Sequence, residues 1–516
     1  MKEGFEPRKY QEALFEDCKD QNALVVLPTG LGKTIVAAML IDKEITHEGK
    51  KALFLAPTKP LVEQHVDTMR DFIPRLSDWT MKIVGGIKPE KRQRIFEMND
   101  VLCATPQTIR NDARDGRIDL SDVGLLIFDE AHRGTGKYAY TQIAEMYQEG
   151  SGGHVVAFTA SPGEDVKSIK EIMENLYVDA LTYKTRDDAD VEPYTHEVDM
   201  AFIEVELKTG IREVKNFLDT CFENRINRAL KLGYLKSNRG ATSRKVLLKY
   251  MKSLQAKLRN GEKHHRLFQT MSLIAQALKL QHALQLVETQ GLKPLLDYFN
   301  SLEEEAESGK TKAAKKLVED GYFQAAKRLT ENLIENGHEH PKMTALRRIV
   351  EKQVEKKESS KIIVFTQYRD SAHNITEMLE ETGVSTQVFL GQAKKKRKGL
   401  TQDEQAEILQ TFREEAFNCL VSTSVGEEGL DIPQVDLVVF FEPVPSAIRS
   451  VQRRGRTGRQ RAGRVITLIT KDTRDEGIRW AAHHKEKRMK NALAELSGRN
   501  EEERPEKSGL SDFVED

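Results

Sequence analysis

The sequence predicts an α/β protein in which two parallel-sheet domains are separated by a mainly helical segment. Short, continuously apolar runs alternate with helical stretches from about residue 20 to about residue 180. The same alternation returns between about residues 361 and 470, after a long stretch in which helical periodicity dominates. Continuous apolar strands joined by crossover helices are typical of a parallel sheet that is covered on both faces.

Ten apolar runs are the expected strands, and each of them ends in small or polar residues. The expected strands of the first domain are 23–28, 51–57, 100–105, 124–130 and 154–161. Those of the second domain are 361–367, 386–391, 418–424, 435–442 and 463–470.

The segment between these two sets of strands has a different pattern. Little strand pattern follows the run 201–207, and long helical periodicity is clearest at 267–289. We therefore expect a first domain at 1–195, a helical insertion at 196–345, a second domain at 346–486 and a charged tail at 487–516.

The bulk composition fits a multidomain protein of the cytoplasm. The chain has 516 residues, so three or four units are expected at roughly 100–200 residues per domain. No apolar run approaches the roughly 18 residues of a membrane span, and the N-terminus lacks the apolar stretch of a signal peptide. The four cysteines, which form no CxxC pair, argue against a disulfide scaffold or a zinc cluster. They are Cys18, Cys103, Cys221 and Cys419.

The net charge of −1 gives no hint of a nucleic-acid partner, but the charge distribution does. Between Lys231 and Thr270 there are eleven Lys and Arg residues against one acid, Glu262. Such a block in a neutral protein is a candidate phosphate-binding surface, although a solvated helix face would have the same composition. A second basic run, 394–398, is equally open to a loop that contacts nucleic acid or to a solvated turn.

A glycine-rich turn, PTGLGKT at 28–34, lies between the apolar run 23–28 and a helical stretch. This is the context of a phosphate loop, in which backbone N–H groups and a helix N-terminus surround phosphate oxygens. We expect Lys33 to reach the β- and γ-phosphates of ATP and Thr34 to ligate Mg²⁺. The remaining nucleotide-binding residues expected in this loop are Thr29, Gly30 and Gly32.

Two further motifs complete the expected ATP chemistry. DEAH at 129–132 follows an apolar strand, which places Asp129 as the Mg²⁺ carboxylate and Glu130 as the base that orients the attacking water. QRRGRTGR at 452–459 lies about 320 residues later, on the second domain. Arg456 and Arg459 would reach the γ-phosphate only when the two domains close, which couples hydrolysis to motion. Arg453 and Arg454 could instead contact nucleic-acid phosphates.

In this order the motifs resemble those of the superfamily 2 helicases and translocases. The resemblance rests on RKYQ (8–11), APTKPLVEQH (56–65), TPQTI (105–109), TASP (159–162), VFTQYRD (364–370) and STSVGEEGLDIP (422–433). It implies two RecA-like motor domains that use ATP and Mg²⁺. Leu27 stands where the general phosphate-loop pattern has glycine, a position that the helicase form of the loop relaxes.

The same resemblance implies roles for individual residues. Gln11 would read adenine, Asp431 would contact the nucleotide, and Gln452 would join the catalytic set. The residues implied to couple ATP to strand movement are His132, Thr159 and Ser161. The residues implied to grip the sugar-phosphate backbone are Thr58, Thr105, Thr366 and Thr423, each of which could also be an ordinary cap or turn residue.

Three segments narrow the resemblance to the Hef/FANCM family, which acts on branched DNA such as stalled forks and Holliday-type junctions. They are 391–405, 422–433 and 442–459. The family carries a helical insertion where this chain has its basic block, so Lys249, Lys252 and Arg259 would hold DNA without reading its sequence. The alternative within enzymes is a double-stranded-RNA-activated ATPase of the Dicer and RNA-sensor branch. A binding scaffold with a vestigial ATPase would require a broken motif, and all the motifs are intact.

Two expectations concern the end of the chain. No ERKxxxD nuclease centre occurs, so we expect no nuclease in this chain, which is either a helicase fragment or a form without the nuclease. The run 507–514 loosely resembles a sliding-clamp peptide with Leu510 and Phe513 as anchors, but Lys507 replaces the expected glutamine and Val514 the second aromatic. A plain terminal segment is the alternative.

Overall fold

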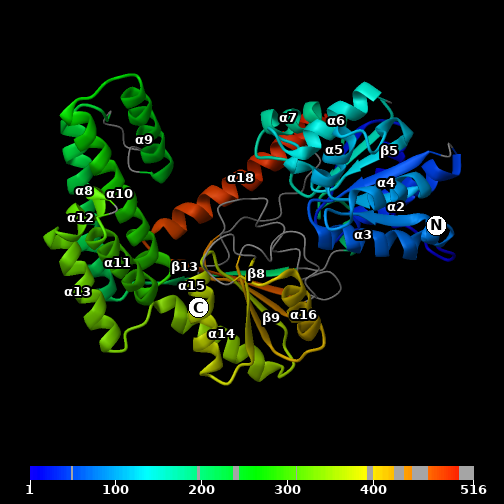
Figure 1. The fold of residues 1–516 in the computed structure, drawn as a ribbon. Helices are drawn as coiled ribbons and strands as arrows, with labels where there is room; N and C mark the ends of the chain where they lie inside the picture. Colours follow the sequence, from blue (N-terminus) through cyan, green and yellow to red (C-terminus); the bar gives the residue numbers. More distant parts are fainter. Residues whose placement is uncertain are drawn as a thin grey trace.

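The computed structural model describes residues 1–47, 50–150, 152–194, 198–235, 243–309, 311–391, 399–423, 435–443 and 463–498. Two parallel-sheet domains and a helical bundle are arranged as in Figure 1. The predicted fold class is confirmed. Among the described helices, none is both long enough and apolar enough to cross a membrane.

The first domain is built on a seven-stranded parallel sheet of order β3-β4-β2-β5-β6-β1-β7. Its strands are β1 (Ala23–Val26), β2 (Lys51–Leu55), β3 (Thr80–Ile83), β4 (Val101–Ala104), β5 (Val123–Phe128), β6 (His154–Thr159) and β7 (Ala180–Tyr183). The helices are α1 (Lys9–Cys18), α2 (Lys33–His47), α3 (Lys59–Phe72), α4 (Pro89–Met98), α5 (Pro106–Arg114), α6 (Ala139–Gly150) and α7 (Val166–Leu176). Short 3-10 turns lie at Pro74–Trp79, Leu120–Asp122, Ala131–Arg133 and Glu192–Tyr194.

Both faces of this sheet are buried, as the continuous apolar runs predicted. Leu24 and Val26 of β1 belong to one hydrophobic core, and Ala23 and Val25 belong to the other. Successive side chains of a strand point to opposite faces, so a strand between two helical layers must be apolar at every position.

The second domain is built on a six-stranded parallel sheet of order β10-β11-β9-β12-β13-β8. Its strands are β8 (Val198–Val205), β9 (Ile362–Phe365), β10 (Thr386–Phe389), β11 (Cys419–Ser422), β12 (Leu437–Phe440) and β13 (Gly463–Thr470). The helices that accompany it are α14 (Pro341–Lys356), α15 (Arg369–Glu380), α16 (Gln402–Arg413) and α18 (Arg474–Ser497).

Strand β8 lies in the second sheet, which differs from the sequence prediction that placed residues 196–345 in the helical insertion. All eight residues of β8 pair in parallel with β13, from Val198 opposite Gly463 to Val205 opposite Thr470. The chain therefore leaves the first domain, contributes an edge strand to the second, and only then forms the helical bundle. Sequence periodicity identifies a strand but not its partner, which explains the difference.

The helical insertion has its own hydrophobic core. Its helices are α8 (Thr209–Lys231), α9 (Arg244–Arg259), α10 (His265–Thr289), α11 (Leu292–Glu307), α12 (Lys312–Val318) and α13 (Gly321–Glu335). Helix α10 is buried on most sides, because α8, α9, α11 and α12 all pack against it.

Helix α18 connects all three parts and continues beyond the predicted start of the charged tail at residue 487 (Figure 1). At its start, the Arg474 guanidinium donates to the carbonyl of Gln281 in the insertion, at 3.0 Å. At its end, Met489 and Leu493 are buried in a core of the first domain. The helix stops at Gly498, whose φ of 66° is the left-handed conformation that commonly ends helices.

Candidate ATP site and nucleic-acid interface

The phosphate loop joins β1 to α2, as predicted. Gly30 and Gly32 have φ values of 85° and 81°, which side chains rarely adopt, and α2 begins at Lys33. A Cβ atom on Gly32 would lie 2.5 Å from Nε2 of Gln11. The loop is therefore wrapped around the N-terminus of α2 in a form that only glycine permits.

Gln11 supports this loop from α1. Its Nε2 donates to the carbonyl of Leu31 at 3.2 Å, and its Oε1 accepts from the backbone N–H of Arg8 at 2.9 Å. The hydroxyl of Tyr10 donates to the same Leu31 carbonyl at 2.9 Å. Gln11 thus lies beside the phosphate loop, where an adenine-contacting residue is expected.

Glu130 of the DEAH motif faces the phosphate loop. Nζ of Lys33 lies 3.7 Å from Oε1 of Glu130 and has no hydrogen-bond partner although it is buried. Burial would raise the pKa of Glu130, but the positive charges of Lys33, His132 and Arg133 outweigh it and hold the pKa well below its usual range. Glu130 has φ 51° and ψ 49°, a left-handed conformation that is uncommon for residues other than glycine.

Asp129 is held rigidly, and sequence reasoning missed the residues that hold it. Its Oδ2 lies 2.9 Å from Nε2 of His65, whose ring stacks on Phe54 with centroids 4.2 Å apart. The hydroxyl of Tyr140 donates to the backbone carbonyl of Asp129 at 2.7 Å. The sequence did contain a signal for His65, because it lies at helical spacing with the apolar residues Val62, Val66 and Met69 on the buried face of α3.

The three predicted coupling residues form a chain from the DEAH motif to the TASP segment. Nδ1 of His132 lies 3.4 Å from Oε2 of Glu130 and 3.3 Å from Oγ1 of Thr159. The backbone N–H of Ser161 donates to the same Thr159 hydroxyl at 3.2 Å. A change at Glu130 can therefore reach the end of β6 through two contacts.

The residues present fit a Mg²⁺ ion. Thr34 offers a hydroxyl at the start of α2, and Asp129 offers a buried carboxylate at the end of β5. Mg²⁺ is usually held by one or two such oxygen ligands together with substrate phosphates. The buried ammonium of Lys33, which lies 3.7 Å from Glu130 and has no hydrogen-bond partner, supplies the positive charge that a phosphate needs beside it.

The predicted strand-gripping residues lie at the carboxyl ends of adjacent strands. Thr58 and Thr105 precede α3 and α5, and they follow β2 and β4, which are neighbours in the sheet. Thr366 and Thr423 follow β9 and β11, which are also neighbours. Thr366 is fully buried and donates to Oε1 of Glu442 at 2.9 Å, so its hydroxyl does not face a ligand.

Glu442 connects this end of the second sheet to the helical insertion. Gln290, the residue that caps α10, donates from Nε2 to Oε1 of Glu442 and accepts from the hydroxyl of Ser371. The backbone N–H of Gln367 donates to Oε2 of Glu442 at 3.2 Å. Burial raises the pKa of Glu442 to about 7, although Lys342 and these hydrogen bonds oppose the rise.

The basic block lies largely on α9, where Lys249, Lys252 and Arg259 are exposed, as is Lys245. Their spacing along a helix puts these four cations on one face. The buried face of α9 packs against α10 through Leu247 and Leu254. Helix α9 is therefore anchored by its apolar face and presents its cations to solvent.

Several predicted functional residues lie outside the described residues. They are Asp431, Gln452, Arg453, Arg454, Arg456, Arg459, the run 394–398 and the tail anchors Leu510 and Phe513.

Comparison with known families identifies the class of protein. The model described as "DEAD/DEAH box helicase" matches residues 8–169, and "Helicase conserved C-terminal domain" matches residues 341–461. Residues 210–336 match "Putative ATP-dependent RNA helicase, helical bundle". Together with the phosphate loop and the DEAH motif, these matches define an ATP-dependent helicase of superfamily 2.

Similarity to individual proteins identifies the family. The crystal structure of the Hef helicase domain of Pyrococcus furiosus is 43% identical, with a TM-score of 0.72, over 92% of this chain and 98% of that one. "DEAD-box ATP-dependent DNA helicase Fancm" of Drosophila melanogaster is 30% identical over 94% of this chain, and "Putative ATP-dependent RNA helicase MJ1505" of Methanocaldococcus jannaschii is 36% identical over 95%. This chain spans 34% and 61% of the lengths of these two relatives. The chain belongs to the Hef/FANCM family, which confirms the resemblance.

Proposed function

We propose that this chain is an ATP-driven DNA translocase that binds and remodels branched DNA, such as stalled forks and Holliday-type junctions. The observation that carries the proposal is the pairing of an intact ATP site with a helical insertion whose exposed cations lie on α9. The name of the Drosophila melanogaster relative, which is called a DNA helicase, supports DNA as the substrate.

In the proposed mechanism, ATP is the substrate and Mg²⁺ neutralises phosphate charge when bound. Lys33 would shift from Glu130 toward the phosphates, because their oxygens carry more negative charge than the single carboxylate 3.7 Å away. Glu130 would then lose the positive charge that lowers its pKa most and become a better base for the attacking water. Substrate binding would therefore activate the base.

Movement of the nucleic acid would follow from two linked contacts. Through His132 and Thr159, a change in the position or charge of Glu130 would alter the strand motifs of the first domain. Gln290 and Glu442 would make the insertion follow the second domain. We assign Gln452, Arg456 and Arg459 to the γ-phosphate and Asp431 to the nucleotide on their motifs alone.

The insertion would hold duplex through phosphates, since α9 offers cations but few aromatic side chains for base stacking. We expect Lys249→Glu/Lys252→Glu/Arg259→Glu to weaken binding to forked DNA. If three phosphate contacts are lost, the slope of log affinity against log salt falls by about 2.7. Basal ATP turnover should stay unchanged, because α9 contributes nothing to the ATP site.

The experiment compares ATP hydrolysis without nucleic acid and with single-stranded DNA, linear duplex, forked DNA and duplex RNA at one salt concentration. Strong stimulation by forked DNA, reduced in the α9 variant, supports the proposal. Stimulation mainly by duplex RNA would assign the protein to the RNA-activated alternative. The control is Lys312→Glu/Lys315→Glu/Lys316→Glu, the same charge change on exposed positions of α12.

A further inference from the structure

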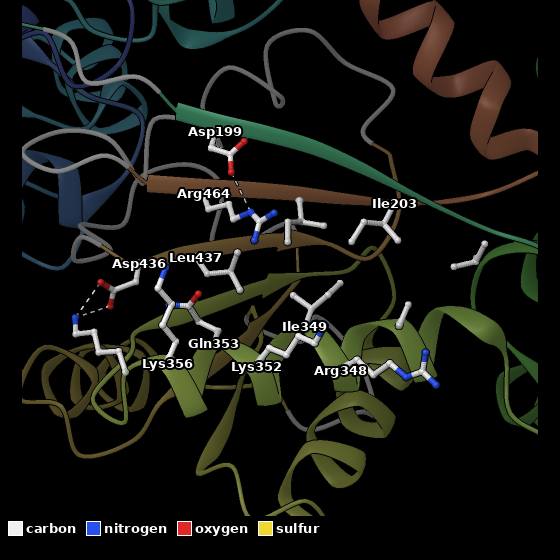
Figure 2. A pocket seen from close by; sticks show the side chains of 14 residues that line it. Asp199, Ile203, Arg348, Ile349, Lys352, Gln353, Lys356, Asp436, Leu437 and Arg464 are labelled. Atoms are coloured by element: carbon white, nitrogen blue, oxygen red, sulfur yellow. Dashed lines mark hydrogen bonds and ion pairs between the residues drawn. The ribbon is translucent and has the colours of Figure 1, made fainter. Parts of the chain in front are cut away.

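A cavity of about 940 Å³ lies in the second domain between α14 and the strands β8, β12 and β13 (Figure 2). Leu437 and Arg464 line it from the starts of β12 and β13, whereas the strand-gripping motifs follow the opposite, carboxyl ends of the strands. None of the described lining residues is assigned to the ATP site or to the proposed strand contacts, so the cavity is separate from both.

The floor of this cavity, which we call the groove, is apolar. Ile203 and Val205 face it from β8, Ile466 from β13, and Ala345 and Ile349 from α14. Because β8 is the edge strand of its sheet, the strands leave this floor partly uncovered at one side. A ligand that fills the groove must therefore supply apolar groups.

The rim of the groove is basic along one side. Arg348, Lys352 and Lys356 are exposed and lie four residues apart on α14, so they form one row. Within the described part of the chain, none of these three has an ion-pair partner. The other charged lining residues are already paired: Arg464 with Asp199 at 3.0 Å, and Lys357 with Asp436 at 2.9 Å.

These features suit an acidic peptide with apolar side chains better than a nucleic acid. A phosphate backbone has no apolar groups to place on the floor, whereas a peptide can place apolar side chains there.

We propose that this groove is the docking site for residues 499–516 of the same chain. That segment has seven acids against three cations, and its large apolar side chains lie at 510–514. The acids are Glu501, Glu502, Glu503, Glu506, Asp512, Glu515 and Asp516, and the cations are Arg499, Arg504 and Lys507. Leu510 and Phe513 would enter the apolar floor, and the last three acids would face the row on α14.

The segment is long enough to reach the groove. The 24 residues of α18 span about 36 Å at 1.5 Å per residue. Residues 499–510 can extend over about 40 Å in the opposite direction. The near end of the groove is Val205, which pairs with Thr470 just before α18. On the way, Glu501–Glu503 would pass the exposed cations Lys487 and Arg488 of α18.

The test is a distance measurement in the full chain between spin labels at Ser511→Cys and Glu355→Cys. All four native cysteines are buried, so the labels go to the introduced residues. We expect one short, narrow distance that persists when labelled protein is diluted with an excess of unlabelled protein. Arg348→Glu/Lys352→Glu/Lys356→Glu and, separately, Leu510→Ala/Phe513→Ala should broaden and lengthen it. The α12 reversal should leave it unchanged.

Four results would overturn the proposal. A broad distribution in the otherwise unsubstituted chain, or a narrow one that survives both sets of substitutions, would mean that the segment does not occupy the groove. A short distance that disappears on dilution would assign the groove to a second copy of the chain. A broad distribution together with weaker DNA binding in the α14 variant would assign the groove to nucleic acid. Because Leu510→Ala/Phe513→Ala alters only the segment, it serves as the test even if the α14 variant does not fold.

Discussion

Glu130→Gln tests whether the ion pair between Lys33 and Glu130 competes with ATP. At the observed 3.7 Å the attraction between two unit charges is about 4.5 kcal/mol for an effective dielectric constant near 20. Desolvation of the two largely buried groups offsets most of this attraction, which leaves a net contribution of about 1 kcal/mol. The glutamine removes the charge but keeps the size of the side chain, so Lys33 becomes free to meet phosphate.

We therefore expect Glu130→Gln to bind a nonhydrolysable ATP analogue about fivefold more tightly, which corresponds to about 1 kcal/mol. Hydrolysis should fall by about 10²–10⁴, the usual contribution of a general base. Binding is measured by titration with the Mg²⁺ complex of a fluorescent analogue, and hydrolysis by phosphate release. Because the analogue is not hydrolysed, slow turnover cannot be mistaken for high affinity.

The matched control is Glu303→Gln, which neutralises the partner of Lys327 in the helical insertion. It should change neither nucleotide affinity nor turnover. If Glu130→Gln binds the analogue no more tightly than the wild type does, while its thermal midpoint is unchanged, then the Glu130 carboxylate and the ATP phosphates do not compete for Lys33. The proposed activation of Glu130 by substrate binding would then be wrong.

Three other predictions concern the buried polar contacts of the second domain. Lys342→Met should destabilise the chain by about 3–5 kcal/mol in denaturant titrations, because it leaves Asp475 buried without its partner. The double change Lys342→Met/Asp475→Leu should recover much of the lost stability, and a cost below about 1 kcal/mol for Lys342→Met alone would contradict the prediction. The raised pKa of Glu442, about 7 against 4.5, means that the folded chain holds a proton that the unfolded chain releases, so stability from this group is lost as pH rises from about 5 to 8. Denaturant titrations at both pH values should show the wild type losing about 2.5 kcal/mol relative to Glu442→Gln, and parallel behaviour of the two proteins would refute the assignment. Gln290→Ala should reduce stimulation of ATP hydrolysis by forked DNA severalfold without changing basal turnover, whereas unchanged stimulation would show that the contact with Glu442 does not link the insertion to the second domain.

Strands that are apolar at every position could be predicted from the sequence, because burial on both faces leaves no other pattern. All ten expected strands are present. Strands β3 and β7 were missed, since they are four-residue edge strands with partly exposed positions such as Lys82 and Thr182. The partner of β8 was missed for a different reason: pairing with β13 joins segments far apart in the sequence.

Residues of the candidate ATP site could be predicted where one short sequence motif contains the residue types that the chemistry requires. Lys33, Glu130 and Thr159 come together as their motifs indicated. Glu442 and Gln290 could not be predicted, because each is a single polar residue whose role depends on a partner 152 positions away. Only the three-dimensional structure shows that both are buried.

The pairing of β8 with β13 also determines the order in which the protein can form during synthesis. Val198 meets Gly463, and the ribosome must add 265 residues between them (463 − 198). At about 5–20 residues per second, β8 waits roughly 13–50 s for its neighbour. The first domain has all of its strands by Tyr183 and can fold during that time. The edge strand, with the exposed Phe202, is meanwhile open to wrong pairing, so slow translation of the insertion should increase aggregation of the nascent chain.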